Sequence, residues 1–99
     1  MMKSNTGIKK EVWMTIFELA KMYHIDKVIL FGSRARGDYE KVSDIDLAIT
    51  GGDPVKFALD VEEYAPTLLK FDIINLDGSV QKELRSSIEK EGVTIYEKI

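Results

Sequence analysis

Two aspartates one residue apart give this sequence its first sign of chemistry. Asp44 and Asp46 stand at the start of an apolar segment that continues through residues 47–49. In a strand, residues two apart project to the same face, so the spacing predicts two carboxylates side by side. Carboxylates that close repel each other unless a cation lies among them. The pair therefore predicts a site for Mg²⁺, which takes oxygen ligands and leaves positions open for phosphate oxygens.

A third acidic residue, Asp72, interrupts the apolar run FDIINL at residues 71–76. A buried carboxylate needs a partner, so this position predicts a buried acid that belongs to the same cluster. With Asp44 and Asp46 it would make a three-carboxylate metal site. Two metal ions in such a site can hold the attacking and the leaving oxygens of an in-line phosphoryl displacement.

A Gly-Ser corner precedes the aspartates and predicts a phosphate-binding turn. Gly32 would let a phosphate approach the backbone closely, and Ser33 could donate its hydroxyl and N–H at the start of a short helical turn. The chain holds three arginines, and Arg34 and Arg36 both follow this corner. Because a guanidinium donates hydrogen bonds in pairs and stays charged, we predict that both arginines help to bind phosphate.

The periodicity of apolar residues predicts the elements that position these side chains. Apolar residues at helical spacing after Ser4-Asn5-Thr6 predict a first helix with a side-chain cap, its inner face formed by Ile8, Val12, Ile16, Leu19 and Tyr23. Two buried strands follow, at residues 28–31 and 44–50. Asp53 and Pro54 then open a second helix, which ends at Pro66 and has Phe57, Val61 and Tyr64 on its inner side.

The remaining sequence predicts a strand, a helix and a last strand. The strand covers residues 68–76, the helix starts at residues 77–79 and is capped by Gly92, and the last strand covers residues 93–97. Val80, Leu84 and Ile88 would form the inner face of that helix. The order αβ(loop)βαβαβ has no repeat and no linker, which predicts one α/β (α+β) domain over residues 1–99 with a small mixed sheet of about four strands.

Connection lengths predict how the strands meet. A helix joins the second and third strands, which favours a parallel pair with a right-handed crossover. The first two strands have no full crossover helix between them, which favours an antiparallel pair. In that arrangement Gly32 and Ser33 lie at the same edge of the sheet as Asp44, Asp46 and Asp72. The topology therefore predicts one rim built from three segments that are far apart in sequence.

Composition limits the classes of partner. The formal net charge is −3 and the pI is about 5.1, so the chain lacks the basic character of a protein that binds nucleic acid directly. The absence of cysteine suits a reducing compartment. No stretch has the roughly 18 apolar residues of a membrane span, and the first residues have no apolar run of the kind found in signal peptides. We expect a cytoplasmic domain without a membrane partner.

Three other features have ordinary structural interpretations. His24 is predicted to lie on the surface after the first helix, and Asp38 and Glu40 in a solvated loop. Trp13 and Phe17 widen the apolar arc of the first helix. They are interpreted as core residues, with an interface kept as the alternative.

The combined pattern resembles the DNA polymerase β-like nucleotidyltransferase superfamily. Its signature is Gly-Ser, ten residues, Asp-x-Asp and a third acid on a later strand, which here are Gly32-Ser33, Asp44-Ile45-Asp46 and Asp72. The short chain and the segment SRARG at residues 33–37 resemble the minimal nucleotidyltransferases (MNT) that pair with HEPN proteins. The resemblance extends from the first strand to the last. It implies that the first two aspartates hold two Mg²⁺ ions and that the third completes the catalytic metal site and helps to activate the acceptor hydroxyl. It also implies that the Gly-Ser turn holds the nucleotide triphosphate, with Arg34 and Arg36 as further nucleotide-binding residues.

The same resemblance implies a partner. Larger relatives carry a second domain that holds the acceptor, and 99 residues leave no room for one, so we expect another chain or a homodimer to present it. In HEPN/MNT pairs the MNT antitoxin transfers AMP from ATP to a tyrosine of the helical HEPN RNase toxin. Two alternatives stay open: an antitoxin that neutralises its partner by binding alone, and a dimeric transferase that modifies small molecules such as aminoglycosides.

Overall fold

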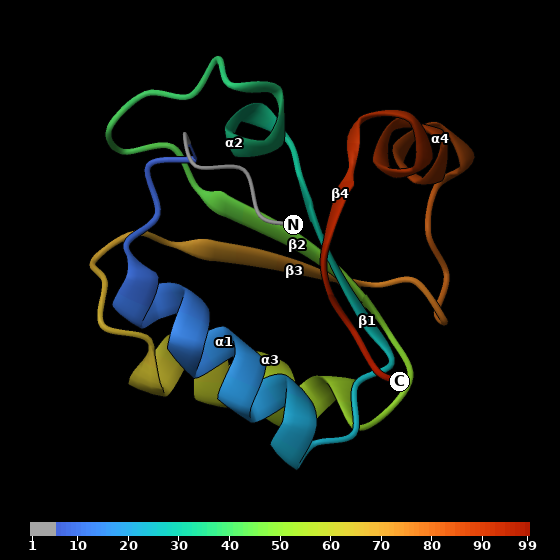
Figure 1. The fold of residues 1–99 in the computed structure, drawn as a ribbon. Coiled ribbons are helices and arrows are strands. Elements are labelled where there is room, and N and C mark those ends of the chain that lie inside the picture. The colour runs from blue at the N-terminus through green and yellow to red at the C-terminus, as the bar shows by residue number, and fades with distance from the viewer. Residues whose placement is uncertain (1–5) are drawn as a thin grey trace.

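A four-stranded sheet runs through the molecule, with helices packed on both faces (Figure 1). The structure is a computed structural model that describes residues 6–99. Its elements follow one another as α1 (Lys10–Met22), β1 (Lys27–Phe31), α2 (Ser33–Arg36), β2 (Ile45–Thr50), α3 (Pro54–Tyr64), β3 (Phe71–Asn75), α4 (Lys82–Glu91) and β4 (Val93–Glu97). The predicted mixed α/β fold is confirmed, including a short helical turn after the first strand.

The strand order is β3-β2-β1-β4. β2 pairs in parallel with β3 across the α3 crossover, and antiparallel with β1, as the connection lengths predict. β4 pairs antiparallel with the other side of β1. The two most buried strands therefore lie in the centre of the sheet, and β3 and β4 form its edges.

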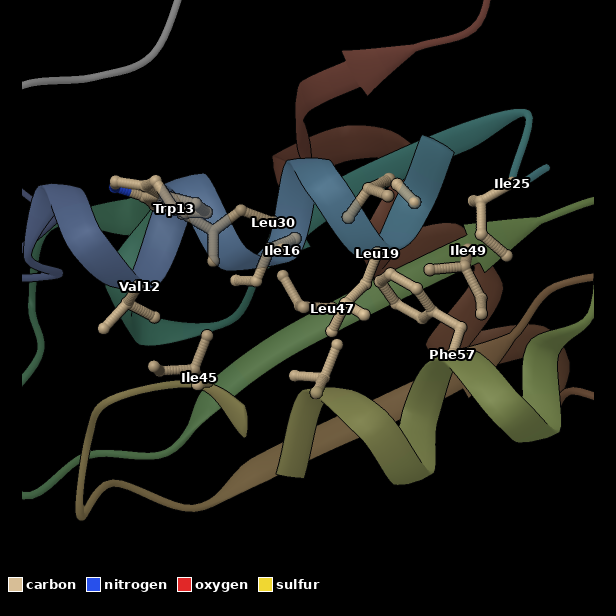
Figure 2. Close-up of a cluster of buried hydrophobic side chains, with 14 of the residues drawn as sticks. Val12, Trp13, Ile16, Leu19, Ile25, Leu30, Ile45, Leu47, Ile49 and Phe57 are labelled. Carbon is tan, nitrogen blue, oxygen red and sulfur yellow. The ribbon is translucent and has the colours of Figure 1, made fainter. Parts of the chain in front are cut away.

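The main core lies between the sheet and the helices α1 and α3. Alternation along β2 sends Ile45, Leu47 and Ile49 to this side, where they meet apolar side chains of both helices (Figure 2). All three are fully buried. Phe57 of α3 and Ile16 of α1 fill the same space, which fixes both helices against β2.

The opposite face of the sheet is covered by α4. Ala48 of β2 and Phe31 of β1 pack there against Ile88 of α4. Asp46 has the same parity as Ala48 and is paired with Asp72, so these two aspartates belong to this face.

Local sequence chemistry sets two helix ends as predicted. Asp53 caps α3 by accepting a hydrogen bond from the amide of Lys56 at 3.1 Å, and Pro54 occupies the first turn. Gly92 caps α4, and its N–H donates to the carbonyl of Ile88 at 2.8 Å. A Cβ on Gly92 would crowd Ile29 of β1, so the close approach of α4 to the sheet also requires glycine here.

Two predicted helix starts are wrong. α1 begins at Lys10 with Lys9 as its N-cap and no side-chain cap; Thr6 instead accepts a hydrogen bond from the amide of Ile8, and the other two residues of the predicted cap, Ser4 and Asn5, lie outside the described residues. α4 begins at Lys82, not at residues 77–79. Asp77 instead connects two loops, because its carboxylate accepts a hydrogen bond from the amide of Gly51 at 2.7 Å.

The third strand is shorter than predicted, and Tyr64 is not an inner residue. β3 covers five residues, and Leu68, which the pattern assigned to the strand, lies fully exposed in the connection before it. Tyr64 is exposed at the end of α3, where the helix has already passed the edge of the core. An edge strand buries fewer of its side chains than a central one, so the apolar pattern overstated its length.

The remaining features agree with the ordinary interpretations. Trp13 is buried in the core, and the half-buried Phe17 packs against the core and stacks between Trp13 and Tyr96 of β4. His24 is exposed, as are Asp38 and Glu40. In the described part of the chain no helix could span a membrane.

Candidate active site

Three strand ends bring the predicted site residues to one rim. Phe31, the last residue of β1, is paired with Asp46 of β2, and Asp46 is paired in turn with Asp72 of β3. Gly32 and Ser33 follow Phe31 directly, and Asp44 precedes the first residue of β2. The antiparallel and parallel pairings together put the Gly-Ser turn and the aspartates at the same end of the sheet.

Gly32 lies directly against the carboxylate of Asp46. Its backbone has φ +75° and ψ −157°, a region that is nearly restricted to glycine. A Cβ at this position would come within 3.0 Å of the carboxyl carbon of Asp46, and closer still to its Oδ2 oxygen. The glycine is therefore needed for the aspartate as well as for the turn.

The carboxyl group of Asp46 is in an unfavourable place for a negative charge. Partial burial, and then the negative charges of Asp72 and Asp44, raise its pKa to about 6 from the usual 3.8. The charges of Arg36 and Arg34 act in the opposite direction but do not compensate. The rim therefore holds more negative charge than its own cations balance, which favours an added cation.

The rim has ligands for Mg²⁺ but not a complete set. Among residues 6–99, no three acidic or histidine side chains are arranged to hold a metal ion by themselves. Mg²⁺ in phosphate-transferring proteins is commonly held by one or two carboxylates together with substrate phosphates and water. Carboxylate oxygens with unbalanced negative charge fit that pattern, so Asp44 and Asp46 are suited to hold the ion with a nucleotide present.

Asp72 is exposed, which corrects the prediction that it is a buried acid. β3 is an edge strand, and the start of its outer face carries no covering helix, so the carboxylate faces solvent instead of a core. Its charge still reaches Asp46. The exposed position leaves Asp72 accessible to an incoming acceptor.

Arg34 does not point to solvent, contrary to what a nucleotide-binding role requires. Its side chain is 2% exposed, and its guanidinium donates to the carbonyls of Ser43 at 3.0 and 3.1 Å and of Thr6 at 2.8 Å. A further donor reaches the carbonyl of Lys41 at 3.3 Å, and the ring of Tyr39 covers one side of the guanidinium. We therefore assign Arg34 to the structure of the loop that ends at Asp44.

Arg36 is exposed and bound to two acids. It forms ion pairs with Asp38 at 3.2 Å and with Glu91 of α4 at 3.6 Å. Its positive charge also lowers the pKa of Asp46, so it lies within electrostatic reach of the rim. A direct contact with a nucleotide phosphate stays a prediction for this residue.

Ser33 begins α2 and is half-buried. The carbonyl of Gly32 accepts from the amides of Ala35 and Arg36 at 3.1 Å, which closes the turn. Within the described residues the hydroxyl of Ser33 has no hydrogen-bond partner. It is therefore available to a phosphate, as predicted for the turn.

Sequence reasoning missed a groove next to the rim. It has a volume of about 1090 Å³ and includes Asp44 in its wall. Lys9, Lys41 and Lys70 also line it, although they are scattered over the sequence and no local motif connects them. Only the folded arrangement of three separate loops could reveal it.

Comparison with known proteins identifies the family. Residues 14–99 match the family model described as "Polymerase beta, Nucleotidyltransferase". A relative from Methanocaldococcus jannaschii named "Putative protein adenylyltransferase MJ0126" is 30% identical over 98 residues, which cover 95% of this chain and all of the relative. The chain belongs to the polymerase β nucleotidyltransferase family. It is a nucleotidyltransferase, as the Gly-Ser and Asp-x-Asp pattern implied.

Solved structures agree with this nucleotidyltransferase fold. One, described as a "toxin-antitoxin with AMP-PNP", has a TM-score of 0.70 at 20% identity, covering 87% of this chain and 73% of the other. Another, described as a "putative minimal nucleotidyltransferase", has a TM-score of 0.63 at 23% identity, covering 82% and 86%. At these identities the likeness concerns the fold.

Proposed function

We propose that this nucleotidyltransferase moves AMP from ATP onto a hydroxyl group of a partner protein, in a reaction that requires Mg²⁺. The observation that carries the proposal is the register that places Asp46 between the Gly-Ser turn and Asp72. This arrangement offers a phosphate turn, metal ligands and an accessible base at one rim. The relative named for protein adenylyltransferase activity supports a protein acceptor.

In the proposed reaction the acceptor oxygen attacks the α-phosphorus of ATP. A new P–O bond forms as the bond from the α-phosphorus to the bridging oxygen breaks, and pyrophosphate leaves. Asp72 takes the proton of the acceptor hydroxyl, since it is an exposed carboxylate on the rim. Gly32 and Ser33 bind the triphosphate, and Arg36 adds positive charge beside it.

Asp44 and Asp46 hold Mg²⁺ in this proposal, with Asp72 contributing to the catalytic ion. Bound Mg²⁺ neutralises charge on the phosphate oxygens and on the leaving pyrophosphate, and two ions suit such a displacement. The chain's own task is to keep the carboxylates next to the Gly-Ser turn. Gly32 permits this arrangement, because a Cβ at that position would take the space of the Asp46 carboxylate.

The proposed partner is a helical HEPN-type toxin, with this chain as its antitoxin and a tyrosine as the acceptor. The family resemblance points to that pairing, and a solved structure with the same fold is a toxin-antitoxin that was studied with AMP-PNP. Tyrosine suits the chemistry because a phenol with a pKa near 10 loses its proton more readily than an aliphatic alcohol.

The test is incubation with labelled ATP and Mg²⁺, with and without the HEPN-type partner, which we expect to be encoded beside this chain, followed by intact mass of both proteins. We expect the partner to gain the mass of AMP. The double variant Asp44→Asn/Asp46→Asn should add none while remaining folded. Full activity in that variant would exclude the proposed metal ligands.

Asp72→Asn separates transfer from neutralisation by binding alone. The change is nearly isosteric and lies on the surface, so docking of the partner should persist. We expect co-purification without modification and without protection of cells from the toxin. Protection equal to wild type would mean that binding alone neutralises the partner.

A further inference from the structure

The groove beside the rim is built by three loops that the proposed chemistry does not use. Its walls come from residues 7–9 before α1, from residues 41–45 at the start of β2, and from residues 65–70 between α3 and β3. Val12 of α1 lies at its base, among the core residues. Because Asp44 belongs both to this wall and to the rim, the groove meets the candidate active site at that residue.

The charge of the groove is opposite to that of the chain. Lys9, Lys41 and Lys70 line it, all exposed, whereas Asp44 is its one acidic residue in the described part of the chain. None of the three lysines has an ion-pair partner among residues 6–99. The chain as a whole has a net charge of −3. A positive groove on an acidic protein attracts acidic segments and repels basic ones.

The groove also presents aliphatic side chains to solvent. Val42 is 82% exposed and Leu68 is fully exposed, and they come from two different walls. Ile8 and Leu69 are partly exposed beneath them. Exposed aliphatic residues gathered in a groove are typical of a surface that binds apolar side chains of a partner.

The lining favours a polypeptide over a nucleotide. No aromatic side chain lines the groove within the described residues, so it offers no surface on which a base could stack. The Gly-Ser turn that suits the triphosphate is not part of its walls. ATP and the occupant of the groove therefore meet only near Asp44.

We infer that this groove binds a segment of the acceptor protein that combines acidic and aliphatic side chains, and leads its hydroxyl residue to the aspartate rim. The acidic residues of the segment pair with the three lysines, and its aliphatic residues contact Val42 and Leu68. The inference rests on the proposed function, since it assigns the bound segment to the acceptor. It adds a selection by charge that the catalytic residues do not provide.

The test uses two short, fluorescently labelled peptides, each with one central tyrosine. The acidic peptide has glutamate and leucine residues on both sides of the tyrosine. The basic peptide is the same except that lysine replaces each glutamate. Binding is measured by anisotropy, with EDTA and without ATP, so that the readout needs no catalysis. We expect the acidic peptide to bind about tenfold more tightly than the basic one, and the difference to shrink in high salt. Equal binding of the two peptides, or none, would overturn the inference.

Charge reversal provides the matched comparison. The variant Lys9→Glu/Lys41→Glu/Lys70→Glu should reverse the preference between the peptides. Reversal of three exposed lysines outside the groove, Lys56→Glu/Lys82→Glu/Lys98→Glu, changes the net charge equally and should preserve it. If both triple variants behave alike, the preference comes from net charge and the groove is not the site.

Two further measurements separate this inference from the proposed function. ATP added with EDTA should leave the bound acidic peptide in place; competition would make the groove a nucleotide site and overturn the inference. With ATP and Mg²⁺, the bound peptide should gain the mass of AMP. Specific binding without that gain would support the groove but count against protein adenylylation.

Discussion

Gly32 joins the end of β1 to the site with a backbone conformation that side chains rarely adopt. We expect Gly32→Ala to displace the carboxylate of Asp46, because the added Cβ needs the space of its Oδ2 oxygen. A displacement of about 1 Å in a catalytic group can lower the rate about 100-fold, and the backbone strain costs about 1–3 kcal/mol. Transfer kinetics and thermal unfolding would measure the two effects.

Gly37→Ala is the matched control for this change. Gly37 also has a positive φ, +96°, but a Cβ there would meet nothing within 4 Å. This variant should lose about 1–2 kcal/mol of stability and keep its activity at temperatures well below unfolding. If both variants lose activity in proportion to stability, the contact with Asp46 does not matter for the chemistry.

Asp46 should weaken the fold of the metal-free protein at neutral pH. Its pKa is raised to about 6, so the folded state binds this proton more tightly than the unfolded state does. The resulting stability is fully present below pH 3.8 and is lost as the pH rises through about 6. In EDTA, Asp46→Asn should therefore be more stable than wild type at pH 7, by about 1 kcal/mol after allowance for solvent screening.

Chemical denaturation at several pH values would measure this effect. The advantage of Asp46→Asn should shrink between pH 7 and pH 4. Glu63→Gln, an exposed carboxylate on α3, should show no comparable gain. An advantage that stays constant with pH would mean that the charge of Asp46 is not its source.

At the scale of residues, the sequence predicted which carboxylates share the rim but not how each is surrounded. Alternation predicted that Asp44 and Asp46 lie near each other, and the charge of Asp44 does act on Asp46, although Asp44 itself precedes the first residue of β2. The exposure of Asp72 depends on β3 being an edge strand, which its own residues do not encode. The partners of Arg34 are backbone carbonyls, which have no signature in the sequence.

At the scale of elements, the loop between α2 and β2 depends on Arg34. We expect Arg34→Met to leave the carbonyls of Lys41 and Ser43 without their donor and to loosen the backbone just before Asp44. A buried carbonyl that loses its donor typically costs about 1–3 kcal/mol. Transfer should also become slower at saturating ATP and should need more Mg²⁺, since Asp44 would be less well placed.

Arg85→Met is the comparison for that effect. Arg85 of α4 also donates to a backbone carbonyl, that of Leu76 at 2.8 Å, but belongs to neither the rim nor its loop. It should lower stability without changing the Mg²⁺ requirement. A shift in the Mg²⁺ requirement for both variants would point to general destabilisation instead of positioning of Asp44.

Helix starts were the least predictable elements, and the reason is physical. Asp53 was recognised because its carboxylate caps the helix that follows immediately, a purely local interaction. Asp77 looks similar in sequence, yet its carboxylate accepts from Gly51, in a different loop. When a carboxylate can accept either from the helix that follows it or from a distant amide, neighbouring residues alone do not show which bond forms.

At the scale of the whole molecule, strand order should determine how firmly each part of the site is held. β1 and β2 are central and most buried, whereas β3 and β4 lie at the edges. In hydrogen exchange we expect the amides of residues 47–49 to exchange slowest, through global unfolding, and those of β3 and β4 to exchange faster. Asp72 is thus carried by a less stable strand than Asp46.

Ligand binding should slow hydrogen exchange at only one of the two edges of the sheet. ATP with Mg²⁺ binds at the rim in the proposed function, so it should slow exchange at the start of β3 more than in β4. β4 is the internal control, because it has the same edge position and lies across the sheet from the aspartates. Equal slowing in both edge strands would indicate global stabilisation without a local contact from Asp72.

The two strand pairs that form the rim were predictable from connection lengths and spacing, whereas the position of β4 and the basic groove were not. The parallel pairing of β2 and β3 follows from the helix between them, a constraint that operates on any sequence. The groove gathers Lys9, Lys41 and Lys70 from three loops, and each of them alone looks like an ordinary solvated charge. Their shared position exists only in the folded chain.

The strand order also bears on synthesis of the protein by the ribosome. β4 pairs with the edge of β1 that β2 leaves free, yet β4 is the last of the four strands to be made. A chain in which β1, β2 and β3 are paired but β4 is not yet in place leaves the apolar strand Lys27–Phe31 with one open edge. Open strand edges are templates for aggregation. Premature termination after Gly92, which removes β4 alone, should therefore lower the yield of soluble protein, measured against the full chain.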